Sequence, residues 1–209
     1  MPLHVVDHPL VAHRVAVLRD ASTGSAEFRQ VAGELAGFLA YEATRAIPTM
    51  DGTVVTPLGI AAATRTLPER RPLLVPILRA GLALLDGVLA AVPTAEVGLV
   101  GLARDEETHL PTPYCVRLPA ERTSEDALVL DPMLATGGSM AYTCGLLAEA
   151  GYTRLTALVL IAAPEGVAAV EAACPDVTVV TAALDPGLDE RAFIVPGLGD
   201  AGDRLYGRA

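Results

Sequence analysis

The stretch ALVLDPMLATGGSMAYTCGLLAEAG, residues 127–151, contains an apolar run, a glycine-rich turn and a helical pattern of apolar residues in direct succession. This order predicts a strand over 127–131 and a helix over 138–150. Because the strand is apolar at successive positions, we expect it to be buried on both faces, as in a parallel sheet covered by helices. The stretch therefore predicts an α/β fold.

The same alternation continues on both sides of this stretch. Further apolar runs predict strands, and the segments between them predict helices that cover the sheet. The predicted strands are 73–78, 97–103, 154–161 and 177–181, and the predicted helices are 82–92 and 164–173. The expected architecture is a central, mostly parallel β-sheet flanked by helices.

The remaining segments complete a single domain over residues 1–209, because this length suits one domain and the chain contains neither a long polar linker nor a repeat. The N-terminal part predicts two helices, one starting at Pro9 and one capped by Ser22 or Thr23. A later segment with three prolines and no helical period predicts a β-hairpin flap. The predicted parts are N-terminal helices over 1–50, an extended arm over 51–66, the flap over 105–126 and a C-terminal segment over 190–209.

Composition excludes several functional classes. Hydrophobic residues make up 52% of the chain and charged residues 19%, which is enough for a core and excludes disorder. The net charge of −10 argues against a general basic surface that would bind nucleic acid or anionic lipid. All 15 basic residues are arginines. The chain therefore has no lysine for Schiff-base chemistry or for a phosphate-binding loop that ends in Gly-Lys-Ser/Thr.

Hydropathy and cysteine spacing predict a cytoplasmic protein. The mean hydropathy is +0.44, but the most apolar runs are interrupted or shorter than the roughly 18–20 residues that a membrane span needs. The N-terminus lacks the basic start and apolar run of a signal peptide. Cys115, Cys144 and Cys174 fit neither a disulfide framework nor CxxC pairs, which is typical of a reducing compartment.

The glycine-rich turn at residues 135–139 is a candidate phosphate site. Backbone N–H groups at the start of a helix are unpaired and lie at the positive end of the helix dipole. The two glycines of the turn would let the backbone approach a phosphate closely, and its threonine and serine add hydroxyl donors. Asp131, at the strand end, is suited to accept hydrogen bonds from sugar hydroxyls. An ordinary helix N-cap without a ligand is the alternative.

Two arginines follow other predicted strands and are candidate ligands for a second anion. In VPILRAG, Arg79 lies in a tight turn between a strand and a helix, and in GLARDEET, Arg104 ends the next strand at the base of the predicted flap. An arginine at such a turn is often only the partner of a surface carboxylate. The residues alone leave both interpretations open.

GLGDAG, residues 197–202, matches the GxGxxG fingerprint of dinucleotide sites without its context. The fingerprint needs a following helix and an acidic residue about twenty positions later, and only seven residues follow Gly202. We expect a glycine-rich loop instead, in which backbone groups and Asp200 face a flat polar ring such as a pyrimidine.

No cluster predicts covalent hydrolysis or a resident metal. The chain has no GxSxG turn and no Cys–His constellation. His4, His8 and His13 are interrupted by Pro9 and lack an organised acidic partner, so metal binding is not expected there. His109 lies in the predicted flap, where an exposed loop histidine is the simpler interpretation.

The motifs VLDPMLATGGS (129–139), VPILRAG (75–81), ARDEET (103–108) and FIVPGLGDAGDR (193–204) occur together in this chain. The first resembles the signature by which type I phosphoribosyltransferases bind 5-phospho-α-D-ribose 1-diphosphate (PRPP). The combination resembles the uracil phosphoribosyltransferase family, and HPLVAHRVAVLRD, AYEATR and APEGVAAV extend the similarity over essentially the whole chain.

This resemblance implies a pentosyltransferase (a glycosyltransferase) of pyrimidine salvage that converts uracil and PRPP to UMP and diphosphate. It implies that Arg79 and Arg104 bind the diphosphate and that Asp200 also faces PRPP, with catalytic roles for Arg104, Asp131 and Asp200. The ribose and 5′-phosphate would be bound by Asp131, Pro132, Met133, Leu134, Ala135, Thr136, Gly137, Gly138 and Ser139. Uracil would be recognised, largely through backbone atoms, by Ile194, Gly199, Asp200 and Ala201.

The resemblance also implies partners. Mg²⁺ would be held mainly by PRPP oxygens and water rather than by side chains. A homo-oligomer, a dimer or larger, is expected, with the arm over 51–66 as an exchange element. Some members of the family are activated by GTP, and this sequence contains no separate guanine-nucleotide motif that would decide whether GTP is an effector here. No nucleic acid or membrane partner is expected.

The chain departs from the wider superfamily at one position. Asp131 is followed by Pro132 where many members carry a second acid, so one ribose contact is missing, as in the uracil-specific branch. Two other functions stay open: a nucleotide sensor that acts on RNA, which would need a basic face, and transfer to a purine, hypoxanthine or orotate.

Overall fold

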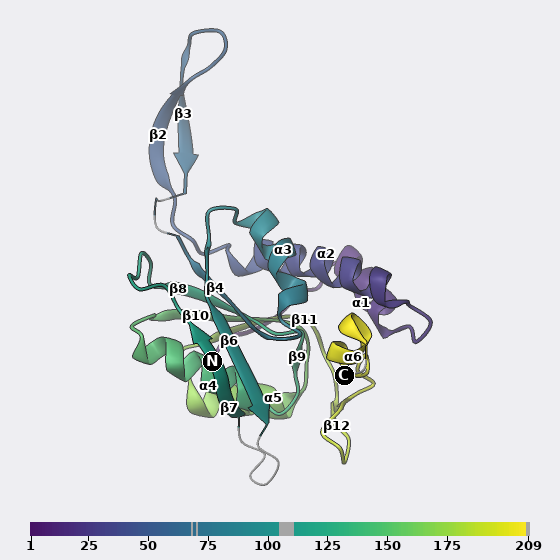
Figure 1. Cartoon of the computed structure of the whole chain (residues 1–209). Coiled ribbons are helices and arrows are strands. Elements are labelled where there is room, and N and C mark those ends of the chain that lie inside the picture. Colours follow the sequence, from purple (N-terminus) through teal and green to yellow (C-terminus); the bar gives the residue numbers. More distant parts are fainter. Residues whose placement is uncertain (68, 70, 105–110, 208–209) are drawn as a thin grey trace.

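The central sheet contains every strand that the apolar runs predict (Figure 1). The structure is a computed structural model, and it describes residues 1–67, 69, 71–104 and 111–207. Within these residues the strand order is β1-β11-β10-β8-β4-β6-β7, with β5 beside β4 and β9 beside β10. The strands are β1 (Leu3–Val5), β4 (Leu73–Leu78), β5 (Glu96–Val97), β6 (Leu99–Arg104), β7 (Pro111–Arg117), β8 (Asp126–Leu130), β9 (Met133–Leu134), β10 (Arg154–Ala162) and β11 (Thr178–Leu184). All neighbouring pairs are parallel except β6 and β7, which confirms the mostly parallel sheet.

Helices cover both faces of the sheet (Figure 1). One layer contains α1 (Pro9–Arg19), α2 (Ser25–Ala43), α3 (Leu82–Ala91) and the short α6 (Ala201–Tyr206), and the other contains α4 (Gly138–Glu149) and α5 (Pro164–Ala173). Along β8, Leu128 and Leu130 belong to the first core, and Ala127 and Val129 belong to the second. The strand is therefore buried on both faces, as its apolar run predicts. Among the described residues, none of the helices has the length and apolar character that crossing a membrane requires.

The start of α2 differs from the prediction. Its N-cap is Gly24, which forms no side-chain cap, so the prediction of Ser22 or Thr23 was wrong. Ser22 donates both its N–H and its hydroxyl to Asp20 Oδ1, at 2.8 and 2.7 Å, and the Thr23 hydroxyl donates to Val17 O at 2.7 Å. These side chains close the turn after α1 and are therefore unavailable to cap α2.

The segment predicted as an extended arm is an antiparallel hairpin that projects from the body of the protein (Figure 1). It consists of β2 (Met50–Val55) and β3 (Ala61–Thr66), and the Thr56 N–H donates to Ile60 O at 3.0 Å across the turn. Every residue of β2 is exposed. The hairpin therefore buries little of its own apolar surface against the rest of the chain.

The predicted flap is also a hairpin, formed by β6 and β7. Its first strand is β6 rather than a segment within 105–126, because Leu99 pairs with Arg117 and Arg104 pairs with Pro111. Residues 105–110, which include Glu106, Glu107 and His109, lie outside the described residues.

Candidate active site

Three neighbouring parallel strands end at the same edge of the sheet, and each end carries a predicted site residue. Asp131 follows β8, Arg79 follows β4, and Arg104 is the last residue of β6. Pro76 pairs with Leu130 and Leu78 pairs with Gly101, so the three ends lie side by side. In open α/β sheets the edge formed by the carboxyl ends of the strands is where ligands bind.

The turn between β8 and α4 is anchored by Gly137. This residue has φ +81°, and a Cβ there would lie 2.6 Å from Gly166 O and 2.8 Å from Ala169 Cβ. Both neighbours belong to α5. Gly137 is thus required by the fold, because any larger residue would clash with α5 and strain the left-handed backbone.

The N-terminus of α4 presents free backbone donors. The first amide of the helix region with a backbone acceptor is that of Ala141, which donates to Gly137 O at 2.8 Å. Within the described residues, the amides of Gly138, Ser139 and Met140 have no acceptor. A Cβ on Gly138 would meet only Pro111 Cδ, at 4.0 Å, so packing does not require glycine there. The N-terminus of α4 is open to an anion, with the first residue of β7 beside it.

Asp131 directly follows β8 at the same edge of the sheet, and the residue is half-buried. Its side chain accepts a long hydrogen bond of 3.4 Å from the Met133 N–H, and its own N–H donates to Leu158 O at 3.2 Å. Burial raises the pKa of this carboxyl to about 7, and the single bond from Met133 opposes that shift only weakly. Hydroxyl donors of a ligand would stabilise the charged form.

The Arg79 turn abuts the end of β8. Gly81 donates to Ile77 O at 2.9 Å, and a Cβ on Gly81 would lie 2.3 Å from Leu130 O. The Leu78–Arg79 peptide bond is cis. Arg79 itself is exposed and forms no ion pair with any residue that the structure describes. The part of the chain that the structure describes therefore offers no carboxylate partner for Arg79.

The C-terminal segment forms a small hood over the same side of the molecule. It contains β12 (Gly187–Leu188), β13 (Ile194–Val195) and the glycine-rich loop before α6. The Leu188 N–H donates to Glu165 Oε1 at 3.2 Å, in the first turn of α5. Since Gly166 in that same turn packs against Gly137, the hood and the glycine-rich turn before α4 rest on one helix end.

The predicted uracil residues differ in what they expose. Ile194 and Ala201 are each 4% exposed, and their side chains belong to the core. Gly199, with φ +78°, is exposed and lines a cavity of about 570 Å³ together with Asp200. Backbone groups, rather than the two apolar side chains, are thus available to a ligand.

Asp200 has a structural task that the sequence analysis missed. Its carboxylate is the N-cap of α6 and accepts the Asp203 N–H at 2.8 Å. One oxygen is therefore already committed to a helix cap, which makes Asp200 a poor general base. The catalytic role predicted for it gains no support from this geometry.

An ion pair that the sequence analysis did not find supports the hood. Arg19, at the end of α1, donates to both oxygens of Asp185, at 2.8 and 2.5 Å. Burial alone would raise the pKa of Asp185, but hydrogen bonds from Arg19 and from the Gly197 N–H lower it below its usual value. The signal for Asp185 was present, because Leu184-Asp185-Pro186 repeats the strand-end pattern of Leu130-Asp131-Pro132.

The histidines and cysteines that the sequence analysis considered form no catalytic or metal-binding cluster among the described residues. His8 Nδ1 accepts the Leu10 N–H at 3.1 Å and caps α1, and the described residues contain no group of three or more metal-ligating side chains. Cys144 is buried, which raises the pKa of its thiol to about 12. All three cysteines are free.

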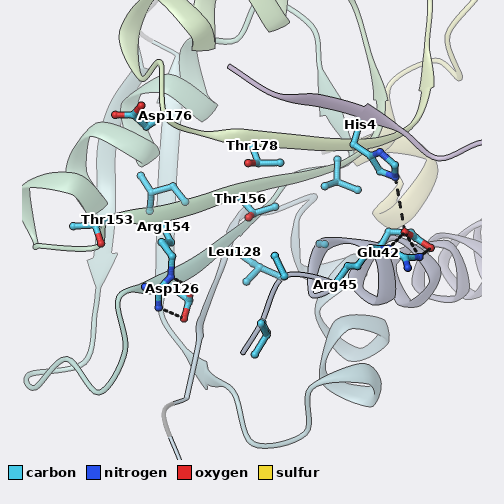
Figure 2. A pocket seen from close by; sticks show the side chains of 15 residues that line it. His4, Glu42, Arg45, Asp126, Leu128, Thr153, Arg154, Thr156, Asp176 and Thr178 are labelled. Carbon is cyan, nitrogen blue, oxygen red and sulfur yellow. Dashed lines mark hydrogen bonds and ion pairs between the residues drawn. The ribbon is translucent and has the colours of Figure 1, made fainter. Parts of the chain in front are cut away.

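A cavity of about 490 Å³ lies at the opposite, amino edge of the sheet (Figure 2). Both of its arginines are already paired, since Arg45 pairs with Glu42 at 2.7 Å and Arg154 pairs with Asp126 at 2.6 Å. It holds none of the predicted site residues.

The sheet order, the strand–Asp-Pro–glycine turn–helix unit and the hood define a type I phosphoribosyltransferase fold. The structure is similar to adenine phosphoribosyl transferase from Trypanosoma brucei, with a TM-score of 0.57 and 14% identity over 92% of this chain and 88% of that one. It is much closer to the AQ2163 protein from Aquifex aeolicus, with a TM-score of 0.91 and 36% identity over 99% of both chains.

The family profile described as uracil phosphoribosyltransferase matches residues 5–208. Proteins of that name from Streptomyces avermitilis and Kineococcus radiotolerans are each 53% identical to this chain, over 100% and 99% of both sequences respectively. The chain belongs to the uracil phosphoribosyltransferase family.

Proposed function

We propose that this protein transfers the phosphoribosyl group of PRPP to uracil, which yields UMP and diphosphate. The observation that carries the proposal is the edge where β8, β4 and β6 end. There the amides at the start of α4 and the Arg79 guanidinium have no partner among the described residues, and burial raises the pKa of Asp131. Full-length identity of about half to relatives named uracil phosphoribosyltransferase supports the choice of base.

Each end of PRPP matches one part of this edge. The amides at the start of α4, with the hydroxyls of Thr136 and Ser139, would bind the 5′-phosphate, and Asp131 would accept the ribose hydroxyls. Arg79 and Arg104 would bind the diphosphate. Backbone groups around Ile194, Gly199 and Ala201 would bind uracil, while the Asp200 carboxylate mainly caps α6.

The chemistry requires that both phosphate ends be held while charge separates between them. Breaking the bond at C1 of the ribose leaves positive charge on the sugar and negative charge on the departing diphosphate. Preorganised amides and guanidinium groups stabilise this distribution without reorganisation. The β6–β7 hairpin, whose Pro111 adjoins Gly138, is suited to exclude water from the activated sugar.

Mg²⁺ fits this site as an ion that the substrate itself coordinates. The described side chains form no group of three or more metal ligands, and PRPP supplies the oxygens that Mg²⁺ prefers. When bound, the ion would neutralise part of the diphosphate charge. The residues of this chain would hold PRPP around the ion: Asp131 would bind the ribose, and the two arginines would bind diphosphate oxygens.

Incubation with PRPP, Mg²⁺ and a panel of bases tests the function. We expect diphosphate release with uracil and at least a hundredfold less with hypoxanthine, adenine or orotate, because a site that pairs with the polar edge of one base leaves groups unpaired with another. Equal or greater turnover of a purine base or orotate would contradict the proposal. The same assay with and without GTP tests whether GTP is an effector.

Gly138 and Gly137 offer a matched pair of variants. Gly138→Ala adds a methyl group at the first residue of α4, where a bound phosphate would approach the backbone. We therefore expect the Kd for PRPP to rise about tenfold or more, the scale of a lost charge-assisted hydrogen bond. Gly137→Ala forces a left-handed alanine against α5 and is expected to lower the free energy of unfolding by about 3 kcal/mol. Calorimetry measures the Kd for PRPP, and urea unfolding measures the free energy of unfolding of each variant. Equal effects of the two variants on folding would contradict the assignment of Gly138 to the ligand.

We also propose that the β2–β3 hairpin packs against a second copy of the chain. Val54, Val55, Leu58 and Ile60 are 48% to 83% exposed, and a lone two-stranded hairpin is only marginally stable in water. Light scattering is expected to give a dimer or larger assembly, and replacement of residues 51–65 by a short turn is expected to reduce it. If the assembly keeps its mass after this replacement, the hairpin does not hold the copies together.

A further inference from the structure

The base-recognition loop is tied to the body of the protein through one glycine. Gly197 donates its N–H to Asp185 Oδ2 at 2.9 Å and accepts a hydrogen bond from Arg19 Nη1 at 2.8 Å. Arg19 in turn donates to both oxygens of Asp185. The three residues form a closed set of hydrogen bonds in which both backbone groups of Gly197 are held.

The hydrogen bonds of Asp185 are strengthened because its side chain is largely removed from water. The Asp185 side chain is 5% exposed and that of Arg19 is 25% exposed. Charge-assisted, bidentate hydrogen bonds are strong and directional in such surroundings. The pair thus fixes an orientation as well as supplying attraction.

The turn at Gly197 sets the course of the residues that follow it. Gly197 has φ +62°, and a Cβ there would lie 2.1 Å from Ile194 O, so the chain reverses sharply at this point. Leu198 is then buried, and Gly199 and Asp200 emerge at the surface. A small rotation at Gly197 would therefore move the backbone groups of Gly199 without disturbing the sheet.

A second guanidinium holds the far end of the loop. Arg204 donates to Leu198 O at 3.1 Å and to Leu18 O, and its guanidinium carbon lies 4.3 Å from the centroid of the Phe28 ring. Leu18 is the neighbour of Arg19. The loop is thus clamped at both ends against the C-terminus of α1.

We propose that Arg19 and Asp185 are positioning residues for uracil: their ion pair fixes the turn at Gly197 and so places the backbone groups of Gly199 and Ala201 that meet the base. This inference rests on the proposed function, because it assigns the loop to the base. It predicts that the pair controls uracil binding and leaves PRPP binding unaffected.

Arg19→Lys and Asp185→Asn test the proposal in the full chain. Lysine keeps the positive charge beside Asp185 but lacks the fork that reaches Gly197 O as well. We expect both variants to raise the KM for uracil about tenfold, with kcat and the KM for PRPP within about twofold of wild type. The matched control is Arg154→Lys, which alters another bidentate pair, Arg154–Asp126, at the opposite edge of the sheet. It is expected to change none of these constants.

Hydrogen exchange separates this inference from the proposed function. In Arg19→Lys the amides of residues 199–203 are expected to exchange faster, while those of α4 keep their wild-type rates. If wild-type protein fails to use uracil, the proposed function is wrong, and exchange still reports on the clamp. Unchanged exchange at 199–203, or equal rises in KM for both substrates, would overturn the positioning role.

Discussion

Asp131→Asn is expected to stabilise the protein at pH 8 and to abolish most of its PRPP binding. Burial raises the pKa of the native carboxyl to about 7, against an ordinary value of 3.8. Between these values the native state binds more protons than the unfolded state, so the contribution of Asp131 to stability falls as the pH rises. Asparagine removes this dependence and keeps an acceptor for the Met133 N–H.

The size of the gain follows from the shift. Each pKa unit corresponds to about 1.4 kcal/mol, so a carboxyl shifted from 3.8 to about 7 makes the variant more stable than wild type by roughly 4 kcal/mol at pH 8. The difference should vanish below about pH 4, where both states of wild type are protonated. Urea unfolding at pH 4, 6 and 8 measures it. A difference that stays constant over this range would show that the Asp131 carboxylate is well compensated in the native state.

Ligand binding should move in the opposite direction. Loss of the ionised acceptor for ribose hydroxyls is expected to weaken PRPP binding by about 3 kcal/mol, or roughly a hundredfold, the scale of two hydrogen bonds to a charged group. In wild type, PRPP affinity should rise with pH through about 7, because the ribose hydroxyls favour the carboxylate. Calorimetry at several pH values measures both effects. Undiminished affinity in the variant would remove Asp131 from the ribose site.

The predicted strands and the glycine-rich turn before α4 come from local patterns that tertiary packing reinforces. The helix over 164–173 has the bounds of α5, and the strand over 73–78 has those of β4, since each run is bounded by proline, glycine or charge. The run over 97–103 is divided between β5 and β6 at Gly98, where a side chain would press on Leu118 and Arg117. The three-residue β1 escaped prediction because its exposed, short edge carries no periodic signal.

What the sequence could not reveal depends on long-range pairing. Arg19 and Asp185 are separated by 166 positions, and nothing near either residue indicates the other. The capping role of Asp200 was hidden because the six-residue α6 is too short for a helical period to emerge. In both cases the local residue type was informative, but its partner was fixed only by the fold.

Arg104→Ala is expected to lower kcat/KM for PRPP by about 3 kcal/mol, or roughly a hundredfold, the scale of one preorganised contact to developing charge. The backbone places Arg104 at the end of β6, beside the β4 end that leads into Arg79 and opposite Pro111 of β7. Because the resemblance assigns the diphosphate to Arg79 and Arg104, loss of one guanidinium should slow bond breaking more than it weakens folding.

Arg117→Ala is the matched control for Arg104→Ala. It removes the same charge from the same hairpin, but Arg117 pairs with Leu99 at the amino end of β6. Five residue steps along a strand amount to roughly 17 Å, which exceeds the Debye length of about 8 Å at physiological salt. The control is therefore expected to keep kcat/KM within about twofold, because screening leaves little of the charge effect at that distance. Equal losses in both variants would mean that net charge, rather than a contact at the end of β6, governs the reaction of PRPP.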